Sequence, residues 1–209
     1  NIDSPEKAYW LGFILADAGI DDKLNVDLKV SIDDKEAIEF ISKEINSRVF
    51  DNYNIDRKRR QFPHSRTSKR IKDITKFTGG KFKKDRHYPR ISKELEPYLL
   101  QGFFDGDGCI TWGHRKDRNR LWHKVSFTSS LSILTGLQQY LYKQDIVTTV
   151  RPKSNENCFV LEFANKKDIL KFYNLVYQDK DFIILKRKYI KYSALRLELE
   201  ENGEGYESK

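Results

Sequence analysis

The sequence has few of the residues that mark secreted, zinc-stabilised or membrane proteins. Only Cys109 and Cys158 are present among 209 residues, which excludes a disulfide framework and a four-ligand cysteine zinc site. No apolar run approaches the length that spans a bilayer, and the N-terminus lacks a secretory pattern. Methionine is absent and the chain starts at Asn1, so we expect the natural start to lie upstream. We expect a soluble, intracellular protein with no membrane partner, located in the cytoplasm or an organelle matrix.

What the chain does have is positive charge in two clusters. The net charge is +8, and residues 57–90 hold 14 Lys or Arg against two acids, whereas residues 1–56 hold 13 acids against six bases. A second basic cluster spans residues 115–124. Such runs often form only a solvated face. Here both are interleaved with aromatic or His side chains, which favours a polyanionic partner, nucleic acid above all.

Residues 99–110 begin as an apolar helix and end in two carboxylates set among glycines. Gly102 and Gly106 are four apart and share one helical face, where the absent side chains let another backbone come close. Asp105 and Asp107 fall at the helix C-terminus, where the helix dipole disfavours acids. This pattern indicates a bound cation. The alternatives are a glycine-terminated helix followed by an acidic turn, and an isolated calcium-like Asp-Gly-Asp loop.

A second copy of this stretch lies 90 residues upstream, at residues 9–20. The copies share small residues at two packing positions and an acid at the end: Gly12 with Gly102, Ala16 with Gly106, and Asp17 with Asp107. Two helices that each need a close partner can pack on one another. This packing would bring Asp17 and Asp107 together.

The paired motifs resemble the LAGLIDADG homing endonucleases in their single-chain, two-motif form. The resemblance implies an α+β fold of two pseudo-symmetric αββαββα repeats, packed through the motif helices. Two antiparallel sheets would form a DNA-binding saddle. We expect the first repeat at 1–90, with a basic linker at about 79–90, the second repeat at 91–199, and an acidic, disordered tail at 200–209.

Hydrophobic periodicity and turn signals predict the elements in that order. In the first half we expect helices to residue 16, at 35–45 and at 69–77, with strands at 24–32, 49–55 and 61–67. In the second half we expect helices at 92–104, 131–142, 166–177 and 184–199, with strands at 110–114, 121–128, 146–151 and 159–163.

The resemblance also implies a metal-dependent reaction on phosphodiesters. It assigns Asp17 and Asp107 as catalytic metal ligands, with the backbone carbonyls of Ala18 and Gly108 as further ligands. Mg²⁺ takes oxygen ligands and keeps several waters, so one acid from each motif plus DNA phosphate oxygens can hold it. Mn²⁺ should substitute, and Ca²⁺ should bind without supporting cleavage. Asp105, which Leu15 replaces in the first copy, is interpreted as a cap or as a group that supports the metal ligands.

The family also places a lysine near each metal position. The matching residues are interpreted as Lys84 and Lys186, each of which could orient water or stabilise developing negative charge. A plain surface lysine is the alternative in this lysine-rich sequence. The first motif departs from the family pattern because Ala18 follows Asp17 where glycine is usual. If that position required a positive φ, alanine would cost about 1 kcal/mol there and the two strands could be cut unequally.

A two-stranded ribbon fits the major groove, and every second side chain on it can reach base edges. We therefore expect DNA contacts from polar residues of the predicted strands and their connections. In the first half these are Asn25, Asp27, Lys29, Arg57, Arg59, Arg60, Arg66 and Lys69. In the second half they are Arg115, Arg118, Arg120, Trp122, Lys124, Ser126, Arg151, Lys153, Asn155 and Asn157.

Three functions are compatible with these motifs. The first is a monomeric endonuclease, encoded within a mobile intron or intein, that cuts both strands of a long, asymmetric DNA site across the minor groove, leaving staggered 3′ overhangs. The second is a maturase that binds its host intron RNA, and the third is a catalytically silent DNA-binding protein. Asp17 and Asp107 favour cleavage, because burying two acids without a metal is costly.

Overall fold

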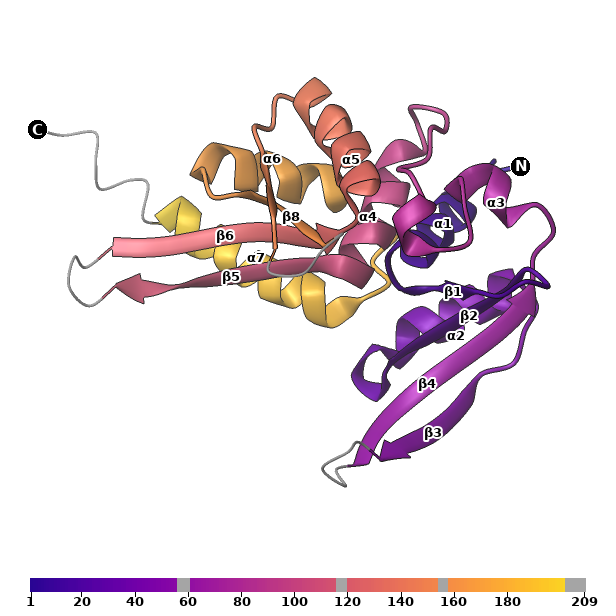
Figure 1. The fold of residues 1–209 in the computed structure, drawn as a ribbon. Helices are drawn as coiled ribbons and strands as arrows, with labels where there is room; N and C mark the ends of the chain where they lie inside the picture. The colour runs from indigo at the N-terminus through magenta and orange to yellow at the C-terminus, as the bar shows by residue number, and fades with distance from the viewer. Residues whose placement is uncertain (56–60, 116–119, 154–157, 202–209) are drawn as a thin grey trace, which may run out of the picture.

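The computed structural model describes residues 1–55, 61–115, 120–153 and 158–201, with the side chains at 53–55, 61, 62, 115 and 120 left out. Within these ranges the first half forms three helices and one four-stranded sheet (Figure 1). Its elements are α1 (Pro5–Asp17), β1 (Gly19–Ile20), β2 (Asn25–Ser31), α2 (Lys35–Glu44), β3 (Phe50–Ile55), β4 (Gln61–Arg70) and α3 (Ile74–Thr78), with a 3₁₀ turn at Ile32–Asp34.

The second half repeats this order and adds a longer final helix. After a 3₁₀ turn at Lys83–Asp85, its elements are α4 (Glu96–Asp107), β5 (Gly108–Arg115), β6 (Arg120–Ser129), α5 (Leu131–Lys143), β7 (Thr149–Pro152), β8 (Phe159–Phe163), α6 (Lys166–Val176) and α7 (Lys186–Glu201). The strand orders β1-β2-β4-β3 and β5-β6-β8-β7 are equivalent, and every pair is antiparallel. The predicted α+β fold with two antiparallel sheets is confirmed.

Helix α1 starts where the sequence signals a start. Ser4 is extended, its Oγ accepts from the Lys7 N–H at 3.4 Å, and Pro5 follows at the first helical position. From there α1 and α4 are buried on nearly all sides rather than along one stripe, as expected for helices at the centre of a protein. They pack on one another between the two sheets (Figure 1).

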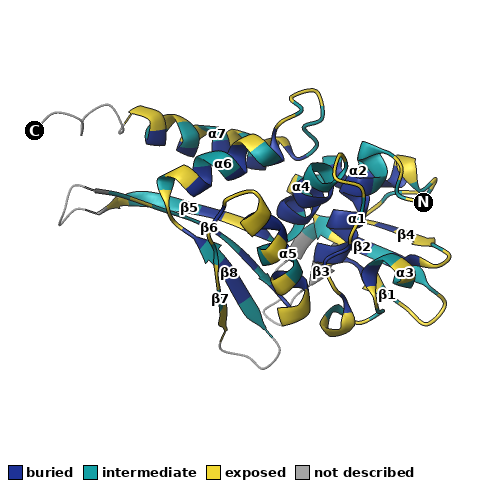
Figure 2. Cartoon of the chain, turned by 90° about the horizontal axis from the view of Figure 1, so that it is seen from above, coloured by how far each residue is buried: buried dark blue, intermediate teal, exposed yellow. Residues whose placement is uncertain are grey.

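Each sheet is covered on one face and open on the other. In the first sheet Val26 and Leu28 are buried, and α2 packs on their side of β2 and β4. In the second sheet Val125 and Phe127 face α5, α6 and α4, while α7 packs along β5. Figure 2 shows α6 and α7 on the same side of this sheet. The alternating residues of both sheets form two open faces.

The one clear error in the predicted elements concerns the helix expected at 69–77. Strand β4 continues to Arg70, because Arg70 pairs with Asn25 of β2, and the helix is limited to Ile74–Thr78. Asp73 precedes this helix in the left-handed conformation, at φ 60°. No helix in the described part of the chain is long and apolar enough to cross a membrane.

Candidate active site

Two glycines set the distance between α1 and α4. A Cβ atom at Gly12 would lie 2.0 Å from the carbonyl oxygen of Leu99, and one at Gly102 would lie 1.9 Å from that of Tyr9. Tyr9 and Leu99 are themselves 90 residues apart, so the two contacts are equivalent under the internal repeat. Any side chain at either glycine would collide with backbone, which explains why these helices contain glycine.

The same packing brings the motif acids together at the C-terminal ends of α1 and α4. A Cβ atom at Gly106 would lie 2.3 Å from Ala16 Cβ and 3.1 Å from Asp17 Oδ2. The Asp17 carboxylate of α1 therefore lies against α4 at Gly106. Burial raises the pKa of Asp17, and it raises the pKa of Asp107 to about 6, with repulsion from Asp17 adding to the latter. The two acids therefore lie close enough to repel one another, with Asp17 exposed at its helix end and Asp107 partly buried.

Lys83 links the two helix ends. Its Nζ donates to the Ala16 carbonyl at 2.6 Å and to Asp107 Oδ2 at 2.8 Å. The lysine thus caps α1 and neutralises the acid of α4. Its positive charge lowers the pKa of both Asp17 and Asp107, although burial remains the larger effect.

Lys188 has the matching position at α4. Its buried Nζ donates to the carbonyls of Phe104 at 2.6 Å and Asp105 at 2.7 Å, and its charge lowers the pKa of Asp17. At α1 a second cation completes the cap, because Arg86 is only 1% exposed and its Nη1 donates to the Ile14 carbonyl at 3.3 Å. Cations are favourable at helix C-termini, so these residues stabilise the ends that carry the acids.

The lysines near the acids are therefore not those that the sequence suggested. Lys84 follows Lys83 on the 3₁₀ turn and lines a surface pocket instead. Lys186 is exposed at the start of α7, and its backbone N–H donates to Glu36 Oε1 at 2.8 Å. Neighbouring residues of a turn or helix point in different directions, so a shift of one or two residues changes which side chain points inward.

Asp105 joins the two helices rather than facing the shared acids. Its Oδ2 accepts from the Tyr9 hydroxyl at 2.8 Å, and no partner for Oδ1 is found among the described residues. Burial raises the pKa of Asp105 to about 7. Leu15, the equivalent residue of the first motif, is fully buried, so this polar contact exists in one copy only.

Ala18 and Gly108 have the same backbone conformation. Their φ and ψ angles are −75° and 136° for Ala18, and −74° and 140° for Gly108. The possible strain at Ala18 is therefore absent, since neither residue has a positive φ. Gly108 is required for another reason, because a Cβ there would lie 2.2 Å from Cδ2 of the Phe104 ring.

Substitutions at Ala18 and Gly108 test whether only Gly108 is restricted by a neighbouring side chain. We expect Ala18→Gly to reduce the free energy of unfolding by about 0.5 kcal/mol, through the added freedom of the unfolded chain. Gly108→Ala should reduce it by about 2 kcal/mol, because the Phe104 ring has to move. Urea unfolding of both variants measures this, and equal effects would show that the ring contact does not matter.

The raised acid pKa values predict that stability falls as pH rises. A folded-state pKa of about 6 for Asp107 and about 7 for Asp105, against 3.8 for an unperturbed aspartate, means that the folded chain binds more protons than the unfolded chain between about pH 4 and 7. The free energy of unfolding should therefore fall across this window. Asp107→Asn should flatten the fall by about 1 kcal/mol or more, measured by urea unfolding with EDTA at pH 5 and pH 8.

The open face of the first sheet holds most of the described candidates from that half. Asn25, Asp27 and Lys29 alternate along β2, and Lys29 lies opposite Arg66 of β4. Arg66 Nε donates to Asp27 Oδ1 at 2.6 Å, which fixes the guanidinium on this face. Lys69 was predicted wrongly, because it pairs with Val26 on the covered face and its Nζ donates to the Asn46 carbonyl at 2.9 Å.

The open face of the second sheet carries Trp122, Lys124 and Ser126 on β6 and Arg151 on β7. Glu162 of β8 lies between them and accepts from Arg151 at 3.0 and 3.2 Å and from Lys124 at 3.2 Å. Lys153 follows β7, and its Nζ lies 3.4 Å from Thr128 Oγ1.

The remaining candidates are less completely defined. Arg115 and Arg120 are backbone partners at the far end of the β5–β6 pair, and their side chains are not described. Six candidates lie outside the described residues: Arg57, Arg59, Arg60, Arg118, Asn155 and Asn157.

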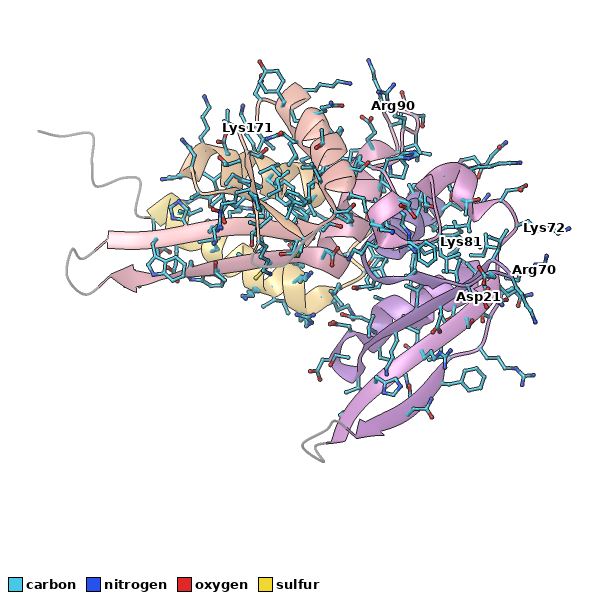
Figure 3. The ribbon with its side chains drawn as sticks, viewed as in Figure 1. Asp21, Arg70, Lys72, Lys81, Arg90 and Lys171 are labelled. Carbon is cyan, nitrogen blue, oxygen red and sulfur yellow. The ribbon has the colours of Figure 1, made fainter. Side chains whose placement is uncertain are left out.

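The strand register adds residues that the sequence interpretation missed. Arg70 and Ser68 lie on the open face of β4, opposite Asn25 and Asp27, and Phe50 of β3 lies opposite Arg66 with 54% of its surface exposed. Arg70 points away from the end of the first sheet in Figure 3. The alternation along β4 could have indicated these residues once its pairing with β2 was known.

The donors at the helix ends suit a hard divalent cation. Asp17 and Asp107 offer carboxylate oxygens, and the adjacent backbone offers carbonyls, which is the ligand type that Mg²⁺ and Ca²⁺ take. No cluster of three or more His, Cys, Asp or Glu that could hold a metal occurs within the described residues. These oxygens therefore fit an ion that draws its other ligands from water and from a bound phosphate group.

Comparison with known proteins finds one matching family model and several solved structures with a similar fold. The model described as a LAGLIDADG-like domain matches residues 94–177. The homing endonuclease I-WcaI bound to its DNA recognition sequence is 18% identical, with a TM-score of 0.62 over 90% of this chain and 86% of that chain. LAGLIDADG homing endonuclease I-GzeII in complex with its DNA target is 10% identical, with a TM-score of 0.62 over 98% and 93%.

A third structure, I-SmaMI bound to an uncleaved DNA target in the presence of calcium ions, is 11% identical, with a TM-score of 0.62 over 96% of this chain and 92% of that chain. No curated protein matches the sequence.

The fold and the paired helices define a single chain in which two equivalent α/β units meet at one acidic position. Residues 94–177 match the LAGLIDADG-like domain, and the chain as a whole has the fold of LAGLIDADG homing endonucleases. The resemblance inferred from the motifs is confirmed.

Proposed function

We propose that the chain is a monomeric, site-specific DNA endonuclease. It hydrolyses phosphodiesters of both strands across the minor groove and leaves staggered 3′ overhangs. The observation that carries this proposal is the shared position of Asp17 and Asp107 at the ends of two helices in backbone contact, between two open sheet faces. The DNA-bound state of the structural relatives supports DNA as the partner.

The acids bind the cation in their ionised form, and the raised pKa values make that form depend on compensation by positive charge. Mg²⁺ is the proposed cofactor, with Mn²⁺ as a substitute and Ca²⁺ as an ion that binds without cleavage. A bound divalent cation lowers the pKa of its water and stabilises charge on the attacking and leaving oxygens. Lys83 favours the ionised form of Asp107, and its ammonium group would stabilise negative charge that develops beside this acid.

The open faces position the duplex over this site. Arg66 and Arg151 are each held by a carboxylate, so their guanidinium groups have a defined direction before DNA binds. A fixed guanidinium can donate two hydrogen bonds to guanine, which discriminates base pairs in the major groove. Trp122 adds an exposed apolar surface, 41% accessible, between the polar residues.

Lys83→Gln tests the reassigned lysine. We expect the cleavage rate under single-turnover conditions to fall about 100-fold, because a group that donates to a catalytic acid and its helix end is lost. Lys81→Gln is the matched control, since Lys81 Nζ pairs with exposed Asp22 at 2.6 Å. Equal rates for the two variants would remove Lys83 from the mechanism.

A randomised duplex library tests the function as a whole. Incubation with Mg²⁺ should yield fragments cut on both strands at one long, asymmetric sequence, and Ca²⁺ should retain the same sequence uncut. Sequence-specific retention without cleavage in Mg²⁺ would instead identify a silent DNA-binding protein. A parallel incubation with intron RNA tests the maturase, which retention of RNA in place of DNA would identify.

A further inference from the structure

A pocket of about 880 Å³ lies between α3, the connection that leads into α4 and the first turns of α5. Lys83 and Lys84 are consecutive residues of one 3₁₀ turn, and the first contacts Asp107 while the second lines this pocket. Figure 1 shows the connection passing beside α5. The turn that holds Lys83 at Asp107 therefore also forms part of the pocket wall.

The wall formed by α5 presents unused hydrogen-bond donors. Ser130 immediately precedes this 13-residue helix in an extended conformation, and its side chain does not cap the helix. Ser130 lines the pocket and is only 7% exposed, and its Oγ is buried with no hydrogen-bond partner within the described part of the chain. The first N–H groups of a helix also lack partners inside the helix and attract anions.

The opposite wall is positively charged. Lys76, Lys84 and Arg90 line the pocket and are exposed. Arg90 lies at the outer end of the connection (Figure 3). None of the described residues that line the pocket is acidic, but Lys76 Nζ is paired with Asp73 Oδ2 at 3.1 Å, so Lys84 and Arg90 are the cations that the proposal uses.

The N-terminus of α2 is the equivalent place in the first half, and acidic side chains of the protein supply its negative charge. Helix α2 follows Asp33 and Asp34 and has Glu36 in its first turn. Asp34 forms a bidentate ion pair with Arg187, and Glu36 accepts from the Lys186 backbone N–H at 2.8 Å. The N-terminus of α5 has Ser130, Leu131 and Ser132 instead. The second half therefore has no acidic side chain at the positions where the first half supplies negative charge.

We propose that this pocket is a phosphate-binding subsite. It holds a backbone phosphate of the DNA strand that continues from the acidic site, between Arg90 and Lys84 on one side and Ser130 with the first turn of α5 on the other. The choice of DNA as the source of the phosphate rests on the proposed function. The anion site itself rests only on the buried hydroxyl, the helix N-terminus and the cations.

Inorganic phosphate tests the anion site in the free protein. In ¹⁵N-labelled protein, titration should shift the backbone amides of Ser132 and Ile133 with saturation. Arg90→Gln and Ser130→Ala should each weaken the apparent affinity about tenfold, while Lys180→Gln, a control on the exposed α6–α7 connection, should not. Absence of saturable shifts, or equal shifts in Arg90→Gln and wild type, would overturn the proposal.

Salt dependence tests whether DNA supplies the phosphate. Affinity for duplex DNA is measured in Ca²⁺ over a range of salt, so that cleavage plays no part. One lost phosphate contact should reduce the slope of log K against log salt by about 0.9 in Arg90→Gln and leave it unchanged in Lys180→Gln. Phosphate binding with an unchanged slope would show that the pocket takes free phosphate and would overturn its assignment to DNA. Failure of the proposed nuclease function would instead appear as intact binding without cleavage in Mg²⁺.

Discussion

Asp107→Asn should reduce the rate of DNA cleavage by about 10³-fold or more. The substitution keeps the shape of the side chain and removes the charge that would hold the proposed cation, which would contribute several kcal/mol of transition-state stabilisation. Asp17→Asn should have a similar effect, because the two carboxylates share one position at the ends of α1 and α4. Single-turnover kinetics on a selected target, with each strand labelled separately, measure both variants.

DNA binding is the control for these variants. Both should keep wild-type affinity for the target within about threefold, since neither acid lies on the open faces of the sheets and each loses one negative charge. A variant that cuts one strand at the wild-type rate would show that its acid serves the other strand only. Wild-type cleavage by both variants would remove the acids from the mechanism.

Gly102→Ala should reduce the free energy of unfolding by about 3 kcal/mol. The added Cβ would lie 1.9 Å from the carbonyl oxygen of Tyr9 and 2.8 Å from its carbon, and backbone cannot move aside as a flexible side chain can. The two helices would have to separate, and the acids at their ends would separate with them. We therefore expect cleavage to fall even at temperatures where the variant stays folded.

Gly19→Ala is the matched control for this substitution. A Cβ at Gly19 would find its nearest neighbour, the carbonyl oxygen of Asp27, at 3.9 Å, which is an ordinary contact. Its unfolding midpoint in urea should lie close to that of the wild type. If Gly102→Ala unfolded at the same midpoint as Gly19→Ala, close contact between the helices would not be a requirement of the fold.

The sequence predicted the features that repeat. Glycine at equivalent helix positions and acids at equivalent helix ends are local patterns, and a second copy indicates that the copies pack together. Strand and helix order followed from hydrophobic alternation, which persists wherever one face is buried. These features depend on spacing within a single element, so one sequence is enough to show them.

The sequence could not predict side chains that reach the site from irregular segments. Lys83 lies on a short 3₁₀ turn, where no periodicity distinguishes it from Lys84, and Arg86 follows two residues later as a buried helix cap. Lys69 was assigned to the wrong face because its side depends on the pairing of β4 with β2. Such assignments require the register and the direction of the chain, both of which are properties of the folded protein.

The two halves also differ in ways that a repeat alone does not indicate. In the second motif the buried Asp105 accepts a hydrogen bond from Tyr9, whereas the equivalent residue of the first motif is the apolar Leu15. The first half closes the N-terminus of α2 with Arg187, whereas the second leaves a cationic pocket beside α5. Asymmetry of this kind would suit the long, asymmetric target of the proposed endonuclease.

The most direct test of the account is to locate the metal in a crystal of the protein with its selected DNA target and Mn²⁺. The account predicts anomalous scattering peaks that contact both Asp17 and Asp107 and an oxygen of the phosphate at which each strand is cut. Peaks bound to only one of the two acids, or to residues outside the ends of α1 and α4, would contradict the claim that the two motifs form a single shared site.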